Sequence, residues 1–321
     1  MTVSEFIDVS VVLVSYNTAR LLEPCIAALR ASMGDLEVQV IVVDNASSDE
    51  SVRLLRNRFV ECELIESRAN VGFGRANNQA LALARGRYVL LLNTDAFVSP
   101  DTLGKTIAYM DAHAGCGVLG VRLIGGDGEQ QPSCRNFPTL FNTFAASVGL
   151  PRWLPRLRMV DDPDWDPTVT RGCDWVPGCY YLIRREAIDQ VGLFDPRFFM
   201  YFEEVDHCRA VKRAGWDVVY FADTTVVHLG GASAAAQTEL AVVARQIAPL
   251  QIESWLLYFR KHDGLLGVCL SMLFVGIADV VLALKSLVKG RPVAELAVHA
   301  SHFAAVWRLF RRTSMGRVPT R

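Results

Sequence analysis

Several short apolar runs early in the chain constrain the fold more than any other feature. Residues 9–14 (VSVVLV), 38–43 (VQVIVV) and 88–92 (YVLLL) are almost unbroken, as strands buried on both faces are. A short strand is predicted at 64–65, and helical spacing predicts helices around 21–29, 52–55 and 75–84. Strands and helices that alternate at intervals of about 25 residues predict right-handed βαβ units. We therefore expect an α/β fold with a mostly parallel, Rossmann-like central sheet.

Polar clusters follow three of these strands directly. They are residues 15–17 (SYN), 44–45 (DN) and 93–95 (NTD). Each cluster taken alone is typical of a turn or a helix cap, and residues 47–49 would cap the helix that follows them. Ligands of parallel α/β sheets bind at the carboxyl ends of the strands, however. Three polar clusters at equivalent strand ends therefore favour a ligand site.

The pattern changes in the middle of the chain. Residues 99–101 (SPD) predict a helix with proline at its first position. Residues 125–172, rich in Gly, Pro, Arg, Trp and Asp, are too long for a plain connector, which predicts a functional or partly mobile insert. A regular secondary-structure pattern resumes at residues 175–183. After it we predict a helix at 185–191, a helix ending at 214, a strand at 217–221 and another ending at His228.

Two single residues suggest a metal site. Asp95 follows an apolar strand, and His228 precedes two glycines that would let backbone approach a ligand closely. Either residue alone is weak evidence, since a lone histidine is more often structural. Together with diphosphate oxygens and water, they could hold Mg²⁺ or Mn²⁺, which would help a diphosphate to leave.

Three acids lie within residues 203–206 (EEVD), after the aromatic stretch 198–202. They could simply stabilise the N-terminus of a helix through its dipole. The functional alternative is a general base with a raised pKa that deprotonates an acceptor hydroxyl. A Gly-containing loop at 70–78 runs into a helix and includes Arg75, which would suit a diphosphate, although its G-x-G spacing is common.

Taken in order, six segments closely resemble family 2 glycosyltransferases of the GT-A fold. The segments are VVLVSYN, IVVDNASSDES, NVGFGRANN, YVLLLNTD, VPGCYYLIRREAIDQVGLFDPRFFMYFEEVDHCRAVKRAGW and VVHLGG, spread over residues 11–231. The subgroup resembles bacterial rhamnosyltransferases that act on polyprenyl-linked or cell-surface glycans. The resemblance implies an inverting, single-displacement transfer from a nucleotide diphosphate sugar, with a divalent metal, Mg²⁺ or Mn²⁺.

The resemblance also implies a role for each matching residue. The nucleotide sugar would be bound by Tyr16, Asn17, Asp44, Asn45, Arg75, Asn77, Asn78, Asn93 and Thr94. The metal would be held by Asp95 and His228. The acceptor side would be lined by Trp175, Gly178 and Glu203, with Glu204 as the general base and Asp206 as the second candidate for that role.

Two positions depart from the family pattern. The D-x-D motif reads Asn93-Thr94-Asp95, so its first acid is an amide. The base position, usually Glu-Asp, reads Glu203-Glu204, and glutamate is one methylene longer. These departures favour one alternative function, a catalytically inactive nucleotide-sugar-binding partner. A nearer alternative is a UDP-hexose transferase of the same fold, because base and ribose contacts do not separate uracil from thymine.

The C-terminal region differs from the rest of the chain. Residues 265–284 are apolar apart from Asp279, and 294–312 have the spacing of a basic amphipathic helix. Residues 260–321 hold ten Lys/Arg against three acids, although the whole chain of 321 residues has a net charge of −1. We expect residues 1–245 to form the catalytic domain and 246–321 a helical, membrane-associating region. Residues 265–284 could lie in the interface, span the membrane or dock on the catalytic domain.

Composition also indicates a compartment and partners. None of the eight cysteines forms a C-x-x-C pair, which predicts free thiols in a reducing compartment rather than disulfides or a zinc site. The run at 9–14 is too short for a signal peptide. We therefore expect a cytoplasmic protein, peripheral to or partly embedded in the inner face of the cell membrane. Its expected partners are a nucleotide sugar, a lipid-linked or polysaccharide acceptor and the membrane surface, with no nucleic acid.

Overall fold

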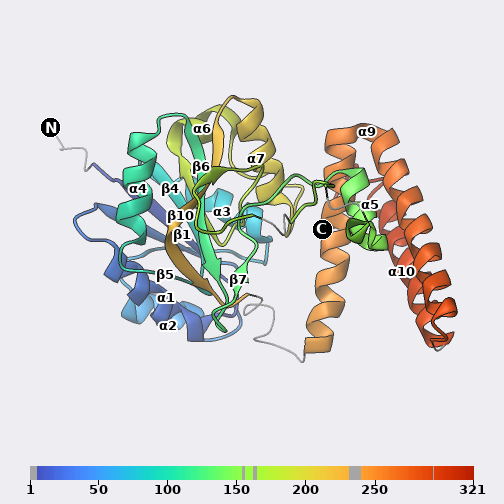
Figure 1. Ribbon diagram of the computed structural model, residues 1–321. Helices are drawn as coiled ribbons and strands as arrows, with labels where there is room; N and C mark the ends of the chain where they lie inside the picture. Colours follow the sequence, from blue (N-terminus) through green and yellow to red (C-terminus); the bar gives the residue numbers. More distant parts are fainter. Residues whose placement is uncertain (1–5, 154–155, 162–164, 231–239, 292) are drawn as a thin grey trace. The chain divides into compact units, whose positions relative to one another are not determined.

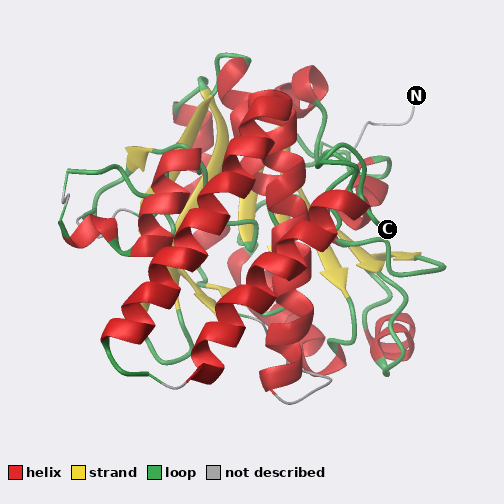
Figure 2. Ribbon diagram, turned by 90° about the vertical axis from the view of Figure 1, so that its right-hand side faces the viewer, coloured by secondary structure: helices red, strands yellow, loops and turns green. Residues whose placement is uncertain are grey.

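The chain folds into two compact units. The computed structural model describes residues 6–153, 156–161, 165–230, 240–291 and 293–321. The first unit comprises Met1–Arg135, Pro163–Pro196 and Glu203–Val243, and every strand assigned in the described residues belongs to it. The second unit comprises Asn136–Asp162, Arg197–Phe202 and Ala244–Arg321 and is helical. Figure 2 draws the helices in red and the strands in yellow. The functional division at residue 245 remains a prediction.

The N-terminal part of the first unit alternates strands and helices as predicted (Figure 1). Its elements are β1 Val9–Ser15, α1 Ala19–Ser32, β2 Val38–Asp44, α2 Ser51–Arg58, β3 Glu63–Glu66, α3 Phe73–Leu81 and β4 Tyr88–Asn93. β1 lies between β2 and β4 and is parallel to both. The side chains of Val11, Leu13, Val42 and Leu90 are fully buried, which explains the unbroken apolar runs.

The strand register places the polar clusters at one edge of the sheet. Ser15 is paired with Asp44 across β1 and β2, and Val14 is paired with Asn93 across β1 and β4. The three strands therefore end at the same level, and their terminal residues are neighbours. This is the arrangement expected for a mostly parallel sheet, which is confirmed.

The remaining elements of this unit complete the sheet. They are β5 Ala96–Val98, α4 Thr102–Ala112, β6 Cys116–Ile124, β7 Gln130–Gln131, β8 Arg171–Gly172, β9 Tyr180–Arg184, α6 Arg185–Val191, α7 Glu203–Arg213 and β10 Asp217–His228. The main strand order is β3-β2-β1-β4-β9-β6-β10-β5. β9 is antiparallel to both β4 and β6, whereas β6 and β10 are parallel. β9 thus joins two groups of parallel strands.

Two local predictions need correction, and a third region contains a helix that the sequence pattern did not predict. One strand, β10, replaces the two expected between 217 and 228, and a register shift between Phe221 and Thr225 explains the apparent break. α4 begins at Thr102, so Pro100 precedes the helix instead of occupying its first position; the Thr102 hydroxyl accepts a hydrogen bond from the Ser99 N–H at 3.0 Å. Residues 125–172 contain a helix, α5 Leu140–Val148, which begins with a capping box at Thr139 and Asn142.

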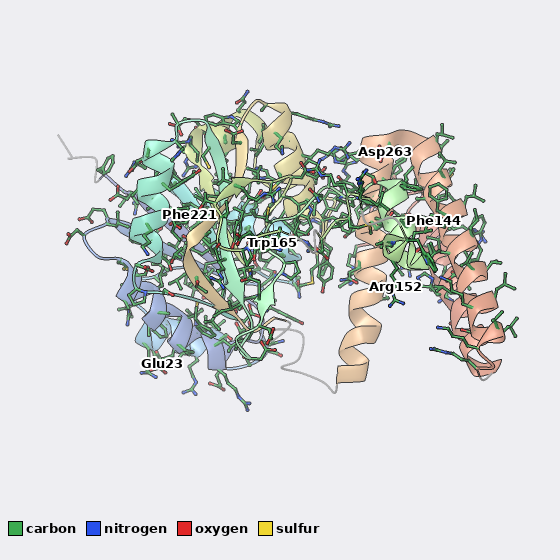
Figure 3. All side chains as sticks on the ribbon, viewed as in Figure 1. Glu23, Phe144, Arg152, Trp165, Phe221 and Asp263 are labelled. Carbon is green, nitrogen blue, oxygen red and sulfur yellow. The ribbon has the colours of Figure 1, made fainter. Side chains whose placement is uncertain are left out.

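An aromatic side chain from outside the sheet packs against β10 in the first unit. The ring of Trp165 meets that of Tyr220 edge-on, with centroids 4.6 Å apart, and Trp165 and Phe221 are marked in Figure 3. All eight cysteines are free thiols, and seven of them are buried. Burial therefore removes these seven thiols from solvent.

The second unit contains the C-terminal helices. α9 Leu240–Val288 is interrupted at Gly264, whose φ of 71° is left-handed and suits glycine, and α10 Val293–Arg312 follows. The predicted segments 265–284 and 294–312 fall within these helices. A core of Leu256, Val268, Met272, Val306, Leu309 and Phe310 holds α9 and α10 together. By length and composition alone, Pro249–Val288 could cross a membrane. Its most apolar stretch of 18 residues has a mean hydropathy of 2.5, and 33% of that stretch is buried.

Candidate active site

The loop after β1 is tied to the loop after β2 through Asn17. Its backbone N–H donates to the Ser47 hydroxyl at 2.9 Å, and its Oδ1 accepts from the Ser48 N–H at 2.7 Å. Asn17 has a left-handed φ of 56°, which asparagine tolerates better than most residues. Its Nδ2 is buried and makes no hydrogen bond within the described part of the chain. Asn17 therefore has one donor for a ligand. Tyr16, beside it, is half-buried.

Asp44 and Asn45 at the end of β2 differ in their hydrogen bonding. Asp44 Oδ2 accepts from the Ser47 N–H at 2.9 Å, while its Oδ1 is buried and has no partner among the described residues. Asn45 Nδ2 donates to Asn70 at 3.0 Å, and its Oδ1 accepts from the Val71 N–H at 2.9 Å. Asn45 thus orders the Gly-containing loop, whereas Asp44 keeps an acceptor for a ligand.

The polar residues of α3 point to different partners. Asn78 Nδ2 donates to the Phe194 carbonyl at 2.7 Å, and its Oδ1 accepts from the Phe194 N–H at 3.1 Å. Arg75 Nε donates to the Pro196 carbonyl at 2.7 Å. Both side chains therefore fasten the segment at 194–196. Asn77 is buried, and its Oδ1 makes no hydrogen bond to any described residue.

β-sheet pairing brings Asp95 and His228 together. β5 follows Asp95 at once and is antiparallel to β10, with Ala96 opposite His228. Asp95 Oδ1 lies 3.6 Å from His228 Nε2, and their side chains are 5% and 18% exposed. Thr94 is buried, and Asn93, at the end of β4, is half-buried. The two residues predicted to bind metal are therefore neighbours on a rigid part of the sheet.

Gln131, on β7, determines which nitrogen of His228 carries the proton. Gln131 Nε2 donates to the His228 carbonyl at 2.9 Å, which fixes the orientation of the amide. Its Oε1 then faces His228 Nδ1 at 2.9 Å, so Nδ1 must be the protonated nitrogen. In the neutral ring, Nε2 therefore presents a lone pair toward Asp95. Burial lowers the pKa of His228, partly opposed by the Asp95 carboxylate.

Glu204 lies in the first turn of α7, close to Gly178. A Cβ placed on Gly178 would lie 3.8 Å from the Glu204 Cβ, so the two backbones approach closely. Burial raises the pKa of the Glu204 carboxyl, and the positive charge of Arg135 opposes this effect. Its Oε2 is buried without a hydrogen-bond partner among the described residues. A carboxyl in this setting holds a proton more tightly than an exposed one does.

Cys179 connects the two parts of the site. Its carbonyl accepts a hydrogen bond from the Asn93 N–H at 3.0 Å, at the end of β4. Burial raises the pKa of its thiol, and the carboxylates of Asp95 and Glu204 both add to that rise. Gly178, the residue before Cys179, lies against Glu204, so the backbone at 178–179 links the end of β4 to the start of α7.

Arg135 is a site residue that the sequence did not reveal. Its backbone pairs with Trp175, and its guanidinium carbon lies 4.3 Å from the centre of the Trp175 ring. Glu203 and Asp206, like Trp175, are buried. Neither Arg135 nor Gln131 belongs to a recognisable motif, because each acts through a neighbour that is distant in sequence.

The described residues contain no group of three His, Cys, Asp or Glu side chains arranged to hold a metal ion. Asp95 and His228 supply two donors, an oxygen and a nitrogen. Mg²⁺ is usually bound by one or two carboxylates together with substrate phosphates and water. Two protein donors therefore fit a cation that binds together with a diphosphate.

The sequence of the chain matches a known family over more than half its length. Residues 10–192 match the sequence model of glycosyl transferase family 2, and the chain belongs to that family. An N-acetylglucosaminyl-diphospho-decaprenol L-rhamnosyltransferase of Mycobacterium tuberculosis is 29% identical over 68% of this chain and 75% of its own length. The rhamnosyltransferase WbbL of Escherichia coli K12 is 25% identical over 68% of this chain and 83% of its own.

Solved structures agree on the fold. A mannosyltransferase of Pyrobaculum calidifontis, in complex with GDP-Man and Mn²⁺, has a TM-score of 0.54 at 15% identity, covering 97% of this chain and 88% of that one. TarS residues 1–349 of Staphylococcus aureus have a TM-score of 0.51 at 15% identity, covering 97% and 92%. The GT-A fold is thereby confirmed.

Replacing Gln131 by leucine should change the tautomer of His228. The wild-type ring should be protonated at Nδ1 near neutral pH, because Gln131 Oε1 accepts that proton. In Gln131→Leu this acceptor is lost, and the Nε2-protonated form should increase. Proton–nitrogen correlation spectra of the imidazole would measure the change. Gln130→Leu is the matched control, since Gln130 bonds Arg122 and Leu123 instead. Identical His228 spectra in wild type and Gln131→Leu would contradict the assignment.

Glu204→Gln should stabilise the fold at neutral pH. A carboxyl whose pKa is raised by folding binds its proton more tightly in the folded state, so its contribution to stability is lost as pH rises through the folded pKa. The melting temperature of Glu204→Gln should therefore exceed that of wild type at pH 7, and the difference should vanish near pH 3. A pKa difference of one unit corresponds to about 1.4 kcal/mol.

Asp111→Asn is a control for which the expected change in stability at neutral pH has the opposite sign. Hydrogen bonds from Arg87 and Tyr88 lower the pKa of Asp111, so this variant should lose stability at neutral pH. Thermal unfolding of the three proteins between about pH 3 and pH 8 tests both signs. A lower melting temperature for Glu204→Gln than for wild type at pH 7 would show that the carboxylate is favourably paired.

Proposed function

We propose that the chain is an inverting, metal-dependent glycosyltransferase that moves L-rhamnose from dTDP-L-rhamnose onto a lipid-linked or cell-surface glycan. The observation that carries this proposal is the pairing of Asp95 with His228 at 3.6 Å, with Glu204 beside Gly178, whose neighbour Cys179 is hydrogen-bonded to Asn93. We take this geometry as support for a cation site with a base nearby. The choice of rhamnose is supported by the relatives of M. tuberculosis and E. coli, both named as rhamnosyltransferases.

Donor recognition is assigned to the buried polar atoms at the ends of β1 and β2. Asn17 Nδ2 and Asp44 Oδ1 are a donor and an acceptor without partners in the described chain, and they suit the base and ribose of a nucleotide. Asn77 Oδ1 is a third such atom. Asn45, Asn78 and Arg75 act through the loops that they fasten, and Tyr16 completes the nucleotide side.

Asp95 and His228 would hold Mg²⁺ or Mn²⁺ together with the donor diphosphate. The Nδ1-protonated state of His228 leaves Nε2 free to coordinate, as Gln131 requires. When bound, the cation would offset the negative charge that develops on the departing diphosphate. Asn93, in place of the usual first acid, reduces the negative charge at the site, so metal and donor diphosphate should bind together more readily than the metal binds alone.

Transfer requires one proton to move. Glu204 takes the proton from the acceptor hydroxyl as that oxygen attacks the anomeric carbon. The bond to the diphosphate breaks with its electron pair on the leaving oxygen, and the configuration at carbon inverts. Burial raises the pKa of Glu204, which makes its carboxylate a stronger base than an exposed one. Trp175, Gly178 and Glu203 belong to the acceptor side, and Asp206 is the second candidate base.

The site of action is assigned to the cytoplasmic face of a membrane. The charge of residues 260–321 suits anionic lipid, and α9 exposes large apolar side chains such as Val280 and Val288. The named activity of the M. tuberculosis relative, on a diphospho-decaprenol acceptor, agrees with a lipid-linked acceptor here.

dTDP-L-rhamnose with Mn²⁺ should raise the melting temperature more than UDP-glucose or GDP-mannose does. Binding at a hundred times Kd stabilises a protein by about 2.7 kcal/mol. Asp95→Asn should lose the Mn²⁺-dependent part of this shift, and Asp166→Asn, an exposed control, should keep it. A shift with UDP-hexose alone would identify a UDP-hexose transferase. A shift with dTDP-L-rhamnose but no donor hydrolysis or transfer would indicate an inactive binding partner, and an unchanged shift in Asp95→Asn would refute the metal assignment.

Glu204→Gln should lower kcat by about 10²–10⁴-fold, the usual loss when general-base help is removed. Donor affinity should hold, because glutamine keeps the size and hydrogen bonding of the side chain. Asp206→Asn, on the same helix and also buried, is the matched control and should do less. Turnover of both variants at saturating donor and acceptor is the measurement. An active Glu204→Gln with an inactive Asp206→Asn would reverse the two roles.

A further inference from the structure

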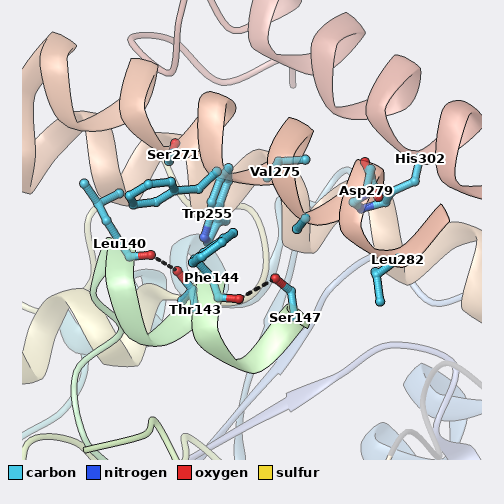
Figure 4. A pocket seen from close by; sticks show the side chains of 12 residues that line it. Leu140, Thr143, Phe144, Ser147, Trp255, Ser271, Val275, Asp279, Leu282 and His302 are labelled. Carbon is cyan, nitrogen blue, oxygen red and sulfur yellow. Dashed lines mark hydrogen bonds and ion pairs between the residues drawn. The ribbon is translucent and has the colours of Figure 1, made fainter. Parts of the chain in front are cut away.

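The second unit contains a cavity that the proposed transfer does not use. It has a volume of about 410 Å³ and lies among α5, α9 and α10 (Figure 4). Cavities that bind small molecules start at about 300 Å³. Its walls are mostly apolar and aromatic, as Leu140, Phe144, Trp255, Phe274, Val275 and Leu282 show. The rings of Phe144 and Phe274 pack with centroids 4.9 Å apart.

The hydroxyl groups on the walls are already used. Thr143 Oγ1 donates to a carbonyl of its own helix, and Ser147 Oγ donates to the Phe144 carbonyl at 2.7 Å, as the dashed lines in Figure 4 show. Ser271 Oγ donates to the Val268 carbonyl at 2.7 Å. Each hydroxyl has a single proton to donate. A sugar or nucleotide in this cavity would therefore find no hydroxyl donor on these walls to replace its hydrogen bonds from water.

The charged groups of the cavity are confined to one place. Asp279 and His302 are the titratable residues among those lining it, and they pair at 3.0 Å. Figure 4 shows the two side chains meeting across α9 and α10. His302 is 49% exposed, so this pair reaches solvent, and the apolar walls extend away from it. The chemistry of the cavity suits a ligand with a long apolar part and a polar end.

An exposed apolar stripe lies beside the cavity on α9. Leu273, Ile277, Val280 and Leu284 are 55%, 41%, 59% and 55% exposed and recur every three or four residues, so they share one face. The wall residues Phe274, Ala278 and Leu282 form the adjacent row of the same helix. Large contiguous apolar surfaces of this kind are typical of contacts with lipid or protein. The stripe would let a hydrocarbon chain pass from a bilayer into the cavity without crossing water.

We propose that this cavity binds the hydrocarbon chain of a membrane lipid. Two sources share this chemistry, the isoprenoid chain of a polyprenyl-linked acceptor and the acyl chain of a phospholipid. Chain binding itself is independent of the proposed transfer; only the isoprenoid source rests on it. The cavity would hold the lipid through burial of methylene groups, each worth about 0.8 kcal/mol.

Trp255 makes the binding measurable in the full-length protein. It lines the cavity, and bromine atoms on a lipid chain quench tryptophan fluorescence at short range. A chain-brominated fatty acid, kept monomeric, should quench the protein saturably, and Trp255→Phe should lose most of that signal. Ala278→Phe, which fills the cavity, should raise Kd about tenfold or more, a loss of about 1.4 kcal/mol. Leu287→Phe is the matched control, on the exposed surface of α9 and not on the cavity wall.

Competition against the brominated probe distinguishes the isoprenoid chain from the phospholipid acyl chain. Displacement by a short polyprenyl phosphate at lower concentration than by a short-chain phospholipid supports the isoprenoid, and the reverse order supports the acyl chain. Asp95→Asn should bind the probe like wild type, because the cavity does not include Asp95. The binding test therefore stays valid even if the proposed catalytic roles are wrong. Equal Kd values for Ala278→Phe and Leu287→Phe, or quenching that stays linear and survives Trp255→Phe, would show surface partitioning and overturn the proposal.

Discussion

Strand β9 joins two groups of parallel strands, and the positions of the site residues depend on it. It runs antiparallel between β4 and β6, so the residues just before it lie at the carboxyl end of β4. That places Cys179 against Asn93 and Gly178 against Glu204. Because backbone groups of a central strand must be paired on both sides, β9 cannot slip without losing hydrogen bonds to both neighbours. The sheet thus fixes the positions of Asn93 and of the backbone at 178–179, against which Glu204 lies.

Burial gives the site its chemistry. The same removal from water raises the pKa of Glu204 and lowers that of His228. The carboxylate becomes a better proton acceptor, and the imidazole favours its neutral form. Asn17 and Asp44 retain buried polar atoms that no described residue satisfies. Unsatisfied buried groups cost stability, and their presence at the ends of β1 and β2 is consistent with the donor site proposed there.

The apolar runs predicted β1, β2 and β4 because strands buried on both faces have no polar alternation. β6 is equally buried, but its sequence pattern does not predict a strand. Gly117 and Gly120 interrupt its apolar run, and there a Cβ would lie 2.6 Å from Trp216 or 2.5 Å from Val176. These glycines are required by side chains from other elements, which the local pattern does not show. The helix α5 was missed too, although Thr139 and Gly149 mark its two ends.

The sequence by itself determined the α/β alternation, the polar strand ends and the family resemblance, because these depend on periodicity and on motifs that are contiguous. It also indicated Asp95, His228 and Glu204 as candidates. Only the tertiary structure decided that Asp95 faces His228, since β5 and β10 pair across more than a hundred residues of chain. The same holds for Gln131 and Arg135, which act on His228 and Trp175 from elsewhere in the sequence. Contacts of this kind leave no local pattern, because the partners are selected by the packing of the sheet and not by their neighbours in the chain.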